Sequence, residues 1–174
     1  HGVIVQSGDK SGSYTADKVI VATGGCSYQS TGSTGDGYRF AKDADIKVTK
    51  CYPSLVPFNI GSDIPKRLQG LSLRNVKVTL SDKGKVLYEE LGEMLFTHFG
   101  VSGPLIISAS SYVGKKFMDK NGQKKELTLE IDLKPALTEE QLDQRVLRDF
   151  EENHNRQFKN AITKLFPTKL IPVM

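Results

Sequence analysis

Val19-Ile-Val-Ala-Thr-Gly-Gly25 is a continuous apolar run, rich in β-branched residues, that ends in paired glycines. A run without polar alternation is typical of a strand buried on both faces, as in a parallel sheet covered by helices. Three more glycines, Gly32, Gly35 and Gly37, lead into a predicted helix over 37–44. Ligands of such sheets bind beyond the carboxyl ends of the strands, where glycine lets main-chain N–H groups approach a phosphate or ribose. The stretch therefore predicts one wall of a nucleotide pocket.

A tight strand-to-helix turn explains the same glycines equally well. The spacing is neither Gly-x-Gly-x-x-Gly nor a P-loop, because no Gly-Lys-Ser/Thr follows. Asp36, between Gly35 and Gly37, also has two interpretations: a hydrogen bond to a ribose hydroxyl, or an Asx turn with its own backbone. The pattern alone leaves both open.

Short strands are predicted on either side of this stretch. Gly2–Ser7 alternates weakly and predicts a hairpin that leads into the buried strand. After the glycines, 46–50 is predicted as a further strand. Pro53 and Pro57 then bracket Ser-Leu-Val. Because proline has no main-chain N–H, this segment is predicted to be an edge strand or a crossing between domains.

Beyond Ile60 the chain alternates apolar and polar residues at period two, as half-buried antiparallel strands do. A turn at Asp82-Lys-Gly84 makes a hairpin of two of these strands. Together they predict a small antiparallel barrel or curled sheet. The predicted strands are Leu71–Leu80, Lys85–Glu90, Gly92–Thr97 and Glu126–Leu133.

Three helices are predicted in the second half of the chain. Ser102, an N-cap candidate with Pro104 in the first turn, begins a short apolar helix. Thr138 and Gln141 form a capping box, which begins an amphipathic helix that continues to about residue 153. A helix over 158–166 ends before a proline, and 119–122 is predicted to be a loop.

The composition limits the class of protein. The 174 residues carry a net charge of +4, with 38% hydrophobic and 25% charged residues, as expected for a globular protein. There is no apolar run of membrane-spanning length and no signal-peptide pattern, so the expected location is the cytoplasm. Cys26 and Cys51 are too far apart for a Cys-x-x-Cys site and are expected to be free and buried. Because no His, Cys and carboxylate residues have metal-ligand spacing, no metal is expected.

The most basic segment is Lys115–Lys125, which raises the question of nucleic acid. A nucleic-acid surface needs a basic stripe, and single-strand binding also needs exposed aromatic side chains. Phe117 is the segment's one aromatic residue, and acidic residues follow at 126, 130 and 132. We expect a solvated loop and no nucleic-acid partner.

Three blocks of sequence resemble a known family. Ala22-Thr-Gly-Gly25 followed by Thr34-Gly-Asp-Gly-Tyr38 is similar to the late part of the FAD-binding domain in flavoproteins with two dinucleotide-binding folds. With Pro53-Ser-Leu-Val-Pro57 and Leu95-Phe-Thr-His-Phe-Gly-Val-Ser-Gly-Pro104, the chain resembles the YhiN-type flavoproteins, also called NAD(FAD)-utilising dehydrogenases or aminoacetone-oxidase-like FAD enzymes. The order and separation of the blocks suit that family across most of the chain.

The resemblance implies an α+β fold in two parts. Residues 53–174 would form a small antiparallel β-barrel-like insert domain with helices, and residues 1–52 part of a Rossmann-like FAD-binding domain. The implied activity is hydride transfer between a nicotinamide cofactor, NAD(P)H, and a small organic substrate through FAD. The resemblance implies FAD contacts at Ala22, Thr23, Gly24, Gly25, Gly35, Asp36 and Gly37.

The loop of the third block supplies the catalytic candidates, Thr97 and His98. His98 lies between aromatic residues, at the end of a predicted strand and just before a helix N-terminus. It could supply a proton or a hydrogen bond to a substrate that faces the flavin. The alternative is a structural turn whose histidine bonds the backbone, and the resemblance assigns His98 no role.

We expect the chain to be an internal piece of a longer protein, because a strand at Val19–Thr23 needs parallel neighbours that the preceding residues do not supply. By itself the piece is expected to fold without FAD, to be inactive, and to self-associate through the uncovered strand. Two other functions stay open. One is a non-enzymatic module that binds protein or RNA, and the other is a flavoprotein that modifies nucleic acid.

Overall fold

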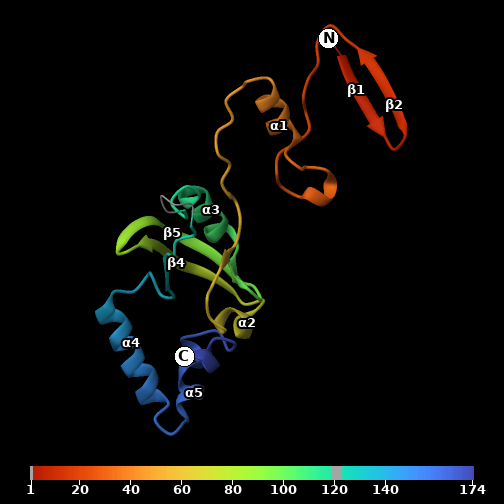
Figure 1. Ribbon diagram of the computed structural model, residues 1–174. Helices are drawn as coiled ribbons and strands as arrows, with labels where there is room; N and C mark the ends of the chain where they lie inside the picture. Colours follow the sequence, from red (N-terminus) through yellow and green to blue (C-terminus); the bar gives the residue numbers. More distant parts are fainter. Residues whose placement is uncertain (1, 119–122) are drawn as a thin grey trace. The chain divides into compact units, whose positions relative to one another are not determined.

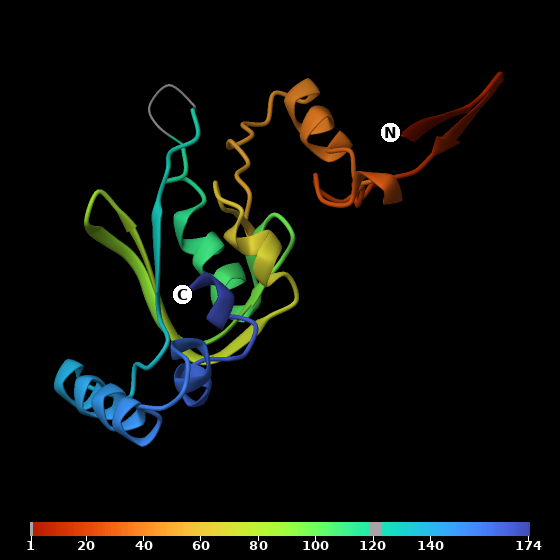
Figure 2. The same cartoon turned by 90° about the horizontal axis from the view of Figure 1, so that it is seen from below.

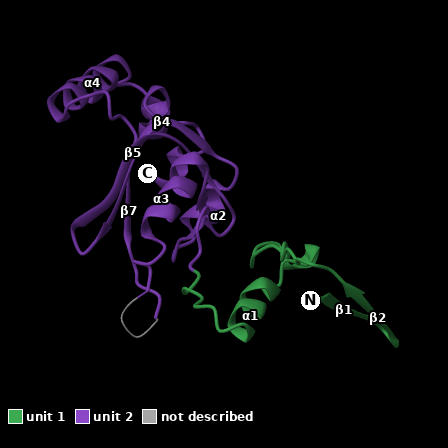
Figure 3. Ribbon diagram, turned by 90° about the horizontal axis from the view of Figure 1, so that it is seen from above, with its two compact units in different colours: residues 1–51 green, residues 52–174 purple. Residues whose placement is uncertain are grey.

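The chain divides into two compact units, residues 1–51 and residues 52–174 (Figure 3). The computed structural model describes residues 2–118 and 123–174, so the predicted loop at 119–122 lies outside the described residues. Each unit is described below by itself.

The first unit contains a hairpin and a short helix. Strand β1 (Gly2–Ser7) pairs antiparallel with β2 (Lys10–Thr15), from Gly2 opposite Thr15 to Ser7 opposite Lys10. A 3-10 turn (Gln29–Thr31) precedes helix α1 (Asp36–Asp43). The predicted hairpin and the predicted helix are therefore confirmed. No described residue of this unit is fully buried, so the unit has no core of its own.

The two further strands predicted in this unit are not formed. Residues 19–23 and 46–50 have no regular secondary structure. The apolar run is exposed rather than buried, and Ile20 reaches 90% exposure. The run has high strand propensity, but a strand forms only when another strand supplies hydrogen bonds. Among the described residues of this unit, β1 and β2 pair only with each other.

The second unit is built on a five-stranded antiparallel sheet in the order β3-β6-β5-β4-β7 (Figure 1). Its central hairpin is long, because the turn at 83–84 joins two strands that pair along most of their length. The short β3 lies at one edge, directly after the Pro53–Pro57 segment, which has no regular structure. The strands are β3 (Phe58–Asn59), β4 (Ser72–Asp82), β5 (Lys85–Phe96), β6 (Gly100–Ser102) and β7 (Thr128–Asp132).

Alternation in β4 and β5 supplies one wall of the core. Leu73, Val76, Val78 and Leu80 of β4 are all buried, and Met94 of β5 lies opposite Leu73. A bulge between residues 73 and 76 shifts the register and curls the sheet. The strands predicted at 85–90 and 92–97 are one continuous strand, since β5 runs through both.

Helix α3 (Pro104–Val113) lies inside the curl of the sheet (Figure 2). It buries Leu105, Ile106 and Ala109 against the strands, whereas Ser111 and Tyr112 are exposed. Its N-cap is Gly103, whereas Ser102, the expected cap, is the last residue of β6. The sheet and this helix together enclose the hydrophobic core.

The remaining helices lie at the ends of the unit. The short α2 (Ile64–Leu68) precedes β4. Helix α4 (Glu139–Glu152) begins at the predicted capping box, which is confirmed. The helix predicted at 158–166 is shorter, since α5 (Phe158–Ala161) continues as a 3-10 turn at Ile162–Lys164.

The α+β class and the barrel-like sheet with helices are thus confirmed. Within the described ranges, none of the helices has the length and apolar character needed to cross a bilayer.

Candidate functional site

The two glycine segments predicted to bind a cofactor meet in the structure. The main-chain N–H of Gly35 donates to the carbonyl of Gly25 at 3.0 Å. Gly35 is also the N-cap of α1, in the left-handed region with φ 83°. The bond therefore sets residues 23–25 beside the first turn of the helix.

Close packing explains why these positions are glycine. A Cβ atom on Gly37 would lie 2.9 Å from Thr23 Oγ1, and one on Gly35 would lie 2.9 Å from Cys26 Sγ. A Cβ on Gly24 would come as close to a neighbouring serine hydroxyl. These contacts belong to the loop itself, so the turn interpretation accounts for the three glycines without a ligand.

The loop nevertheless has main-chain N–H groups that a ligand could bind. Those of Gly24, Gly25, Asp36 and Gly37 donate no hydrogen bond within the described residues, and none of the four residues is buried. The groups of Asp36 and Gly37 are the first of α1, where unpaired N–H groups and the helix dipole favour an anion. A phosphate-bearing dinucleotide such as FAD fits these donors.

The Asp36 carboxylate is used locally. It accepts a hydrogen bond from Thr34 Oγ1 at 3.1 Å and pairs with Arg39 at 3.1 Å, on the exposed side of α1. Both partners are side chains rather than backbone amides, so the Asx turn and the ribose contact both stay predictions. Ala22 is exposed and makes no polar contact of its own in the described residues.

Tyr38 belongs to α1, and the thiols of Cys26 and Cys51 lie near its hydroxyl. A hydrogen bond with the Cys51 side chain, together with the charges of Cys51 and Cys26, raises the pKa of Tyr38. Both cysteines are free and exposed, which corrects the expectation that they are buried. Burial was expected because free cysteine is commonly buried, but the first unit has no core to bury it.

Thr97 and His98 lie in the second unit, in the turn that joins β5 to β6. The main-chain N–H of Thr97 donates to the Gly100 carbonyl at 2.8 Å, and the Thr97 hydroxyl accepts from the Gly100 N–H at 3.1 Å. The hydroxyl of Thr97 therefore closes the turn. His98 is exposed at its tip, with its ring edge-on to Phe99 at 4.8 Å between centroids.

Backbone contacts with neighbouring segments fix this turn. Ile60 N–H donates to the Phe99 carbonyl at 3.2 Å, and Gly70 N–H donates to the Phe96 carbonyl at 2.8 Å. A Cβ on Gly100 would lie 1.9 Å from the carbonyl oxygen of Phe58, so only glycine allows β3 and β6 to pair here. The exposed ring of His98 thus belongs to a turn whose backbone is fixed by hydrogen bonds and packing.

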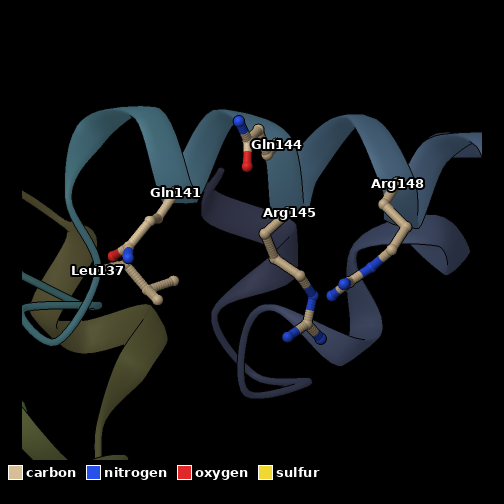
Figure 4. A pocket seen from close by; sticks show the side chains of 5 residues that line it. All are labelled: Leu137, Gln141, Gln144, Arg145 and Arg148. Carbon is tan, nitrogen blue, oxygen red and sulfur yellow. The ribbon is translucent and has the colours of Figure 1, made fainter.

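A surface pocket lies elsewhere, on α4 (Figure 4). It has a volume of about 280 Å³ and is lined by Leu137, Gln141, Gln144, Arg145 and Arg148. Sequence reasoning treated this helix only as an amphipathic element and missed these residues. Their spacing of three and four residues, which places them on one helical face, was the available signal.

A smaller pocket of about 120 Å³ lies where the bulge of β4 meets the C-terminal segment. None of the residues predicted to bind the cofactor or to act in catalysis lines either pocket. Among the described residues, no three His, Cys, Asp or Glu side chains are grouped so as to hold a metal ion.

Comparison with known proteins finds a family model and several curated relatives. A family model described as the HI0933-like protein barrel and H2TH domain matches residues 52–174. The 3-dehydro-bile acid delta(4,6)-reductase of Clostridium scindens is 28% identical over 91% of the chain. The ribosomal RNA dihydrouridine synthases of Escherichia coli and Haemophilus influenzae are 30% and 33% identical, over 89% and 88% of the chain.

The chain spans only part of these relatives. The matched region covers 38% of the bile acid reductase and 35% and 34% of the two synthases.

Proposed function

The chain belongs to the HI0933-like family, a flavoprotein family, and from this premise we propose that the whole protein is an FAD-dependent reductase. The observation that carries the proposal is the hydrogen bond between Gly35 and Gly25, which gathers two glycine segments and their unpaired N–H groups. The named relatives are oxidoreductases, which supports an enzyme rather than a binding module.

The first unit would contribute to holding FAD. The N–H groups of Gly24, Gly25, Asp36 and Gly37 would donate to its phosphate or ribose oxygens, with Ala22 and Thr23 forming the adjoining wall. When bound, FAD supplies the two-electron chemistry of hydride transfer. We propose NAD(P)H as the electron donor.

Our proposal for the substrate class is based on the chemistry that the relatives' names share. One name describes reduction of double bonds in a 3-dehydro bile acid, and the other describes conversion of uridine to dihydrouridine. In both compounds a carbon–carbon double bond is conjugated with a carbonyl group, which makes its far carbon electrophilic. We propose that this protein reduces a conjugated carbon–carbon double bond in a small organic substrate.

Such a reduction adds a hydride to one carbon and a proton to the other. His98 is the candidate to supply the proton or to hydrogen-bond the substrate carbonyl, because its ring is exposed and its turn is fixed. Thr97 would act by positioning the turn, since its hydroxyl already accepts the Gly100 N–H.

The absorption spectrum of the full-length protein tests the proposal. We expect flavin absorption in the purified protein, its loss when NADH or NADPH is added without oxygen, and its return when a conjugated enone is added. A colourless protein, or a flavin that neither nicotinamide reduces, would contradict the proposal.

A second candidate substrate is a base in RNA. It is favoured by the two synthases, which at 30% and 33% are more similar to this chain than the bile acid reductase is. Ribosomal RNA from cells with and without the gene would differ by one uridine carrying two extra hydrogens, which mass spectrometry detects. Identical RNA from the two strains would remove this candidate.

A further inference from the structure

The pocket on α4 has both polar and apolar parts and lies along one helix face. Gln141, Gln144, Arg145 and Arg148 recur at intervals of three and four residues, and Leu137 closes the N-terminal end (Figure 4). None of the helix's carboxylates lines the pocket. Its polar part is therefore a set of guanidinium and amide groups.

Arg145 is held in place by a buried carboxylate. Its Nε donates to both oxygens of Asp149, at 3.0 and 2.9 Å, and the Asp149 side chain is only 3% exposed. This leaves the two terminal nitrogens of Arg145 as donors toward the pocket. Asp149 offsets one positive charge and fixes the direction of the group that carries it.

The glutamine at the helix start is oriented in a similar way. Its carbonyl oxygen Oε1 accepts from the Thr138 N–H at 3.0 Å as part of the capping box. The amide NH₂ group of Gln141 is the part left to meet a ligand. Both oriented residues therefore present donors.

Arg148 adds a positive charge that is not offset. Within the described residues it has no ion pair or side-chain hydrogen bond, and Figure 4 shows its guanidinium turned toward that of Arg145. Two guanidinium groups that face each other favour an anion placed between them. A planar fork of N–H donors from each side suits the oxygens of a phosphate group.

The size of the pocket bears on whether the phosphate belongs to a small molecule or to a polymer. Pockets that bury small ligands are about 300–1,000 Å³ and mainly apolar. This one is about 280 Å³, lies along one helix and is lined by two arginines, two glutamines and one leucine. It suits one phosphate of a polymer that gains the rest of its affinity from further contacts along the chain.

We propose that Arg145 and Arg148, with Gln141 and Gln144, bind a phosphodiester of an RNA substrate. The inference rests on RNA as the second candidate substrate, and it places the contact on α4 rather than on the Lys115–Lys125 segment, where no nucleic acid was expected. Asp149 is a positioning residue that acts through Arg145.

Binding of a labelled single-stranded RNA of mixed sequence to the full-length protein tests this. We expect Arg148→Gln to raise Kd about tenfold, as loss of a charge-assisted bond does. The slope of log affinity against log salt should also fall by about one. Arg156→Gln is the matched control, because Arg156 is exposed, carries the same charge and does not line the pocket. It should change Kd less than twofold.

Three results would overturn the site: no RNA binding by the unmodified protein, equal weakening by both substitutions, or no weakening by Arg148→Gln. Inorganic phosphate and NADPH serve as competitors. If Arg148→Gln weakens NADPH binding and leaves RNA binding unchanged, the pocket binds the dinucleotide and the RNA assignment fails. Flavin reduction by NADPH is recorded in parallel, so failure of the reductase proposal is seen separately from failure of RNA binding.

Discussion

At the scale of single residues, a few positions set the geometry around the β5–β6 turn. Gly100 is the most constrained of them, because any side chain there would meet the backbone of β3 at Phe58. His98, two residues earlier, is exposed and free to vary in structural terms. The same turn therefore contains Gly100, which packing restricts to glycine, and His98, whose exposed ring can contact a ligand.

Gly100→Ala is expected to lower the free energy of unfolding by about 1–3 kcal/mol, the usual cost of inserting a group into a packed site. The new Cβ would lie 1.9 Å from the Phe58 carbonyl oxygen, so β3 and β6 must separate. Urea unfolding measures the change. Gly61→Ala is the control, because no atom lies within 4 Å of its Cβ position, and it should change stability little. An equal effect of both variants would contradict the packing argument.

His98→Gln is expected to slow substrate reduction about 10²- to 10⁴-fold, the usual contribution of a general acid. Stopped-flow absorption of the full-length protein separates the steps. Flavin reduction by nicotinamide should keep its rate, and reoxidation by substrate should slow. Folding should be unchanged because the ring is exposed. Thr97→Val, in contrast, removes the acceptor of the Gly100 N–H and should destabilise the chain. Unchanged reoxidation in His98→Gln would leave the turn with a structural role alone.

Tyr88 links stability to alkaline pH. Its side chain is buried, and its hydroxyl donates to Glu90 Oε2. Burial first, and then the Glu90 carboxylate, raise the pKa of Tyr88 above its ordinary value of about 10. The folded chain holds this proton more tightly than the unfolded chain does. The resulting stabilisation is complete below pH about 10 and is lost as the pH rises above it.

We therefore expect the free energy of unfolding to fall as pH rises through about 10, and Tyr88→Phe to flatten this fall. Denaturant titrations at a series of pH values measure it. Tyr112→Phe is the control, since Tyr112 contacts the Tyr88 ring but is 66% exposed. A fall of the same steepness in Tyr88→Phe would show that another group is responsible.

At the scale of elements, sequence patterns succeeded where the determining interactions are local. The alternation in β4, the turn at 82–84 and the capping box of α4 involve neighbours in sequence, and all three are confirmed. The strand predicted at 19–23 failed because pairing is non-local, so apolar β-branched residues alone cannot form it. The pocket on α4 was missed for a similar reason. The spacing of Arg145 and Asp149 is visible in the sequence, but the burial of Asp149 is not.

Thr138→Ala is expected to destabilise α4 and to lower the free energy of unfolding by about 1 kcal/mol. The threonine hydroxyl accepts from the Gln141 N–H at 3.2 Å, and the Thr138 N–H donates to Gln141 Oε1 at 3.0 Å. Thr163→Ala is the matched control, because that hydroxyl donates to the carbonyl three residues earlier and caps no helix start. Helical circular dichroism on heating provides the measurement. Equal effects of the two variants would indicate that the capping box adds no stability beyond that of an ordinary side-chain hydrogen bond.

At the scale of the whole molecule, the two units differ in how they are stabilised. The second unit has a buried core that includes Leu68, Val78 and Ile106. The first unit has no fully buried residue among those described, and its apolar run is open to solvent. That difference in burial predicts that the first unit takes part in association.

Ile20→Lys is expected to reduce self-association of the 174-residue chain and to leave its unfolding midpoint unchanged, because Ile20 is 90% exposed. Sedimentation velocity measures the first effect and thermal unfolding the second. Val86→Lys introduces the same charge at an exposed apolar position of the second unit, 55% exposed, and should leave association as it was. If both variants reduce association equally, net charge rather than the apolar run is the cause.

The hydrogen bonds that hold the β5–β6 turn also bear on how a ligand would be selected. Backbone bonds from Ile60 and Gly70 secure the segment before any partner arrives. Little conformational entropy then remains to be lost when a molecule settles against His98. Discrimination at this point would come from the shape and acidity of the incoming group, with no adaptive movement of the peptide to accommodate a poor match.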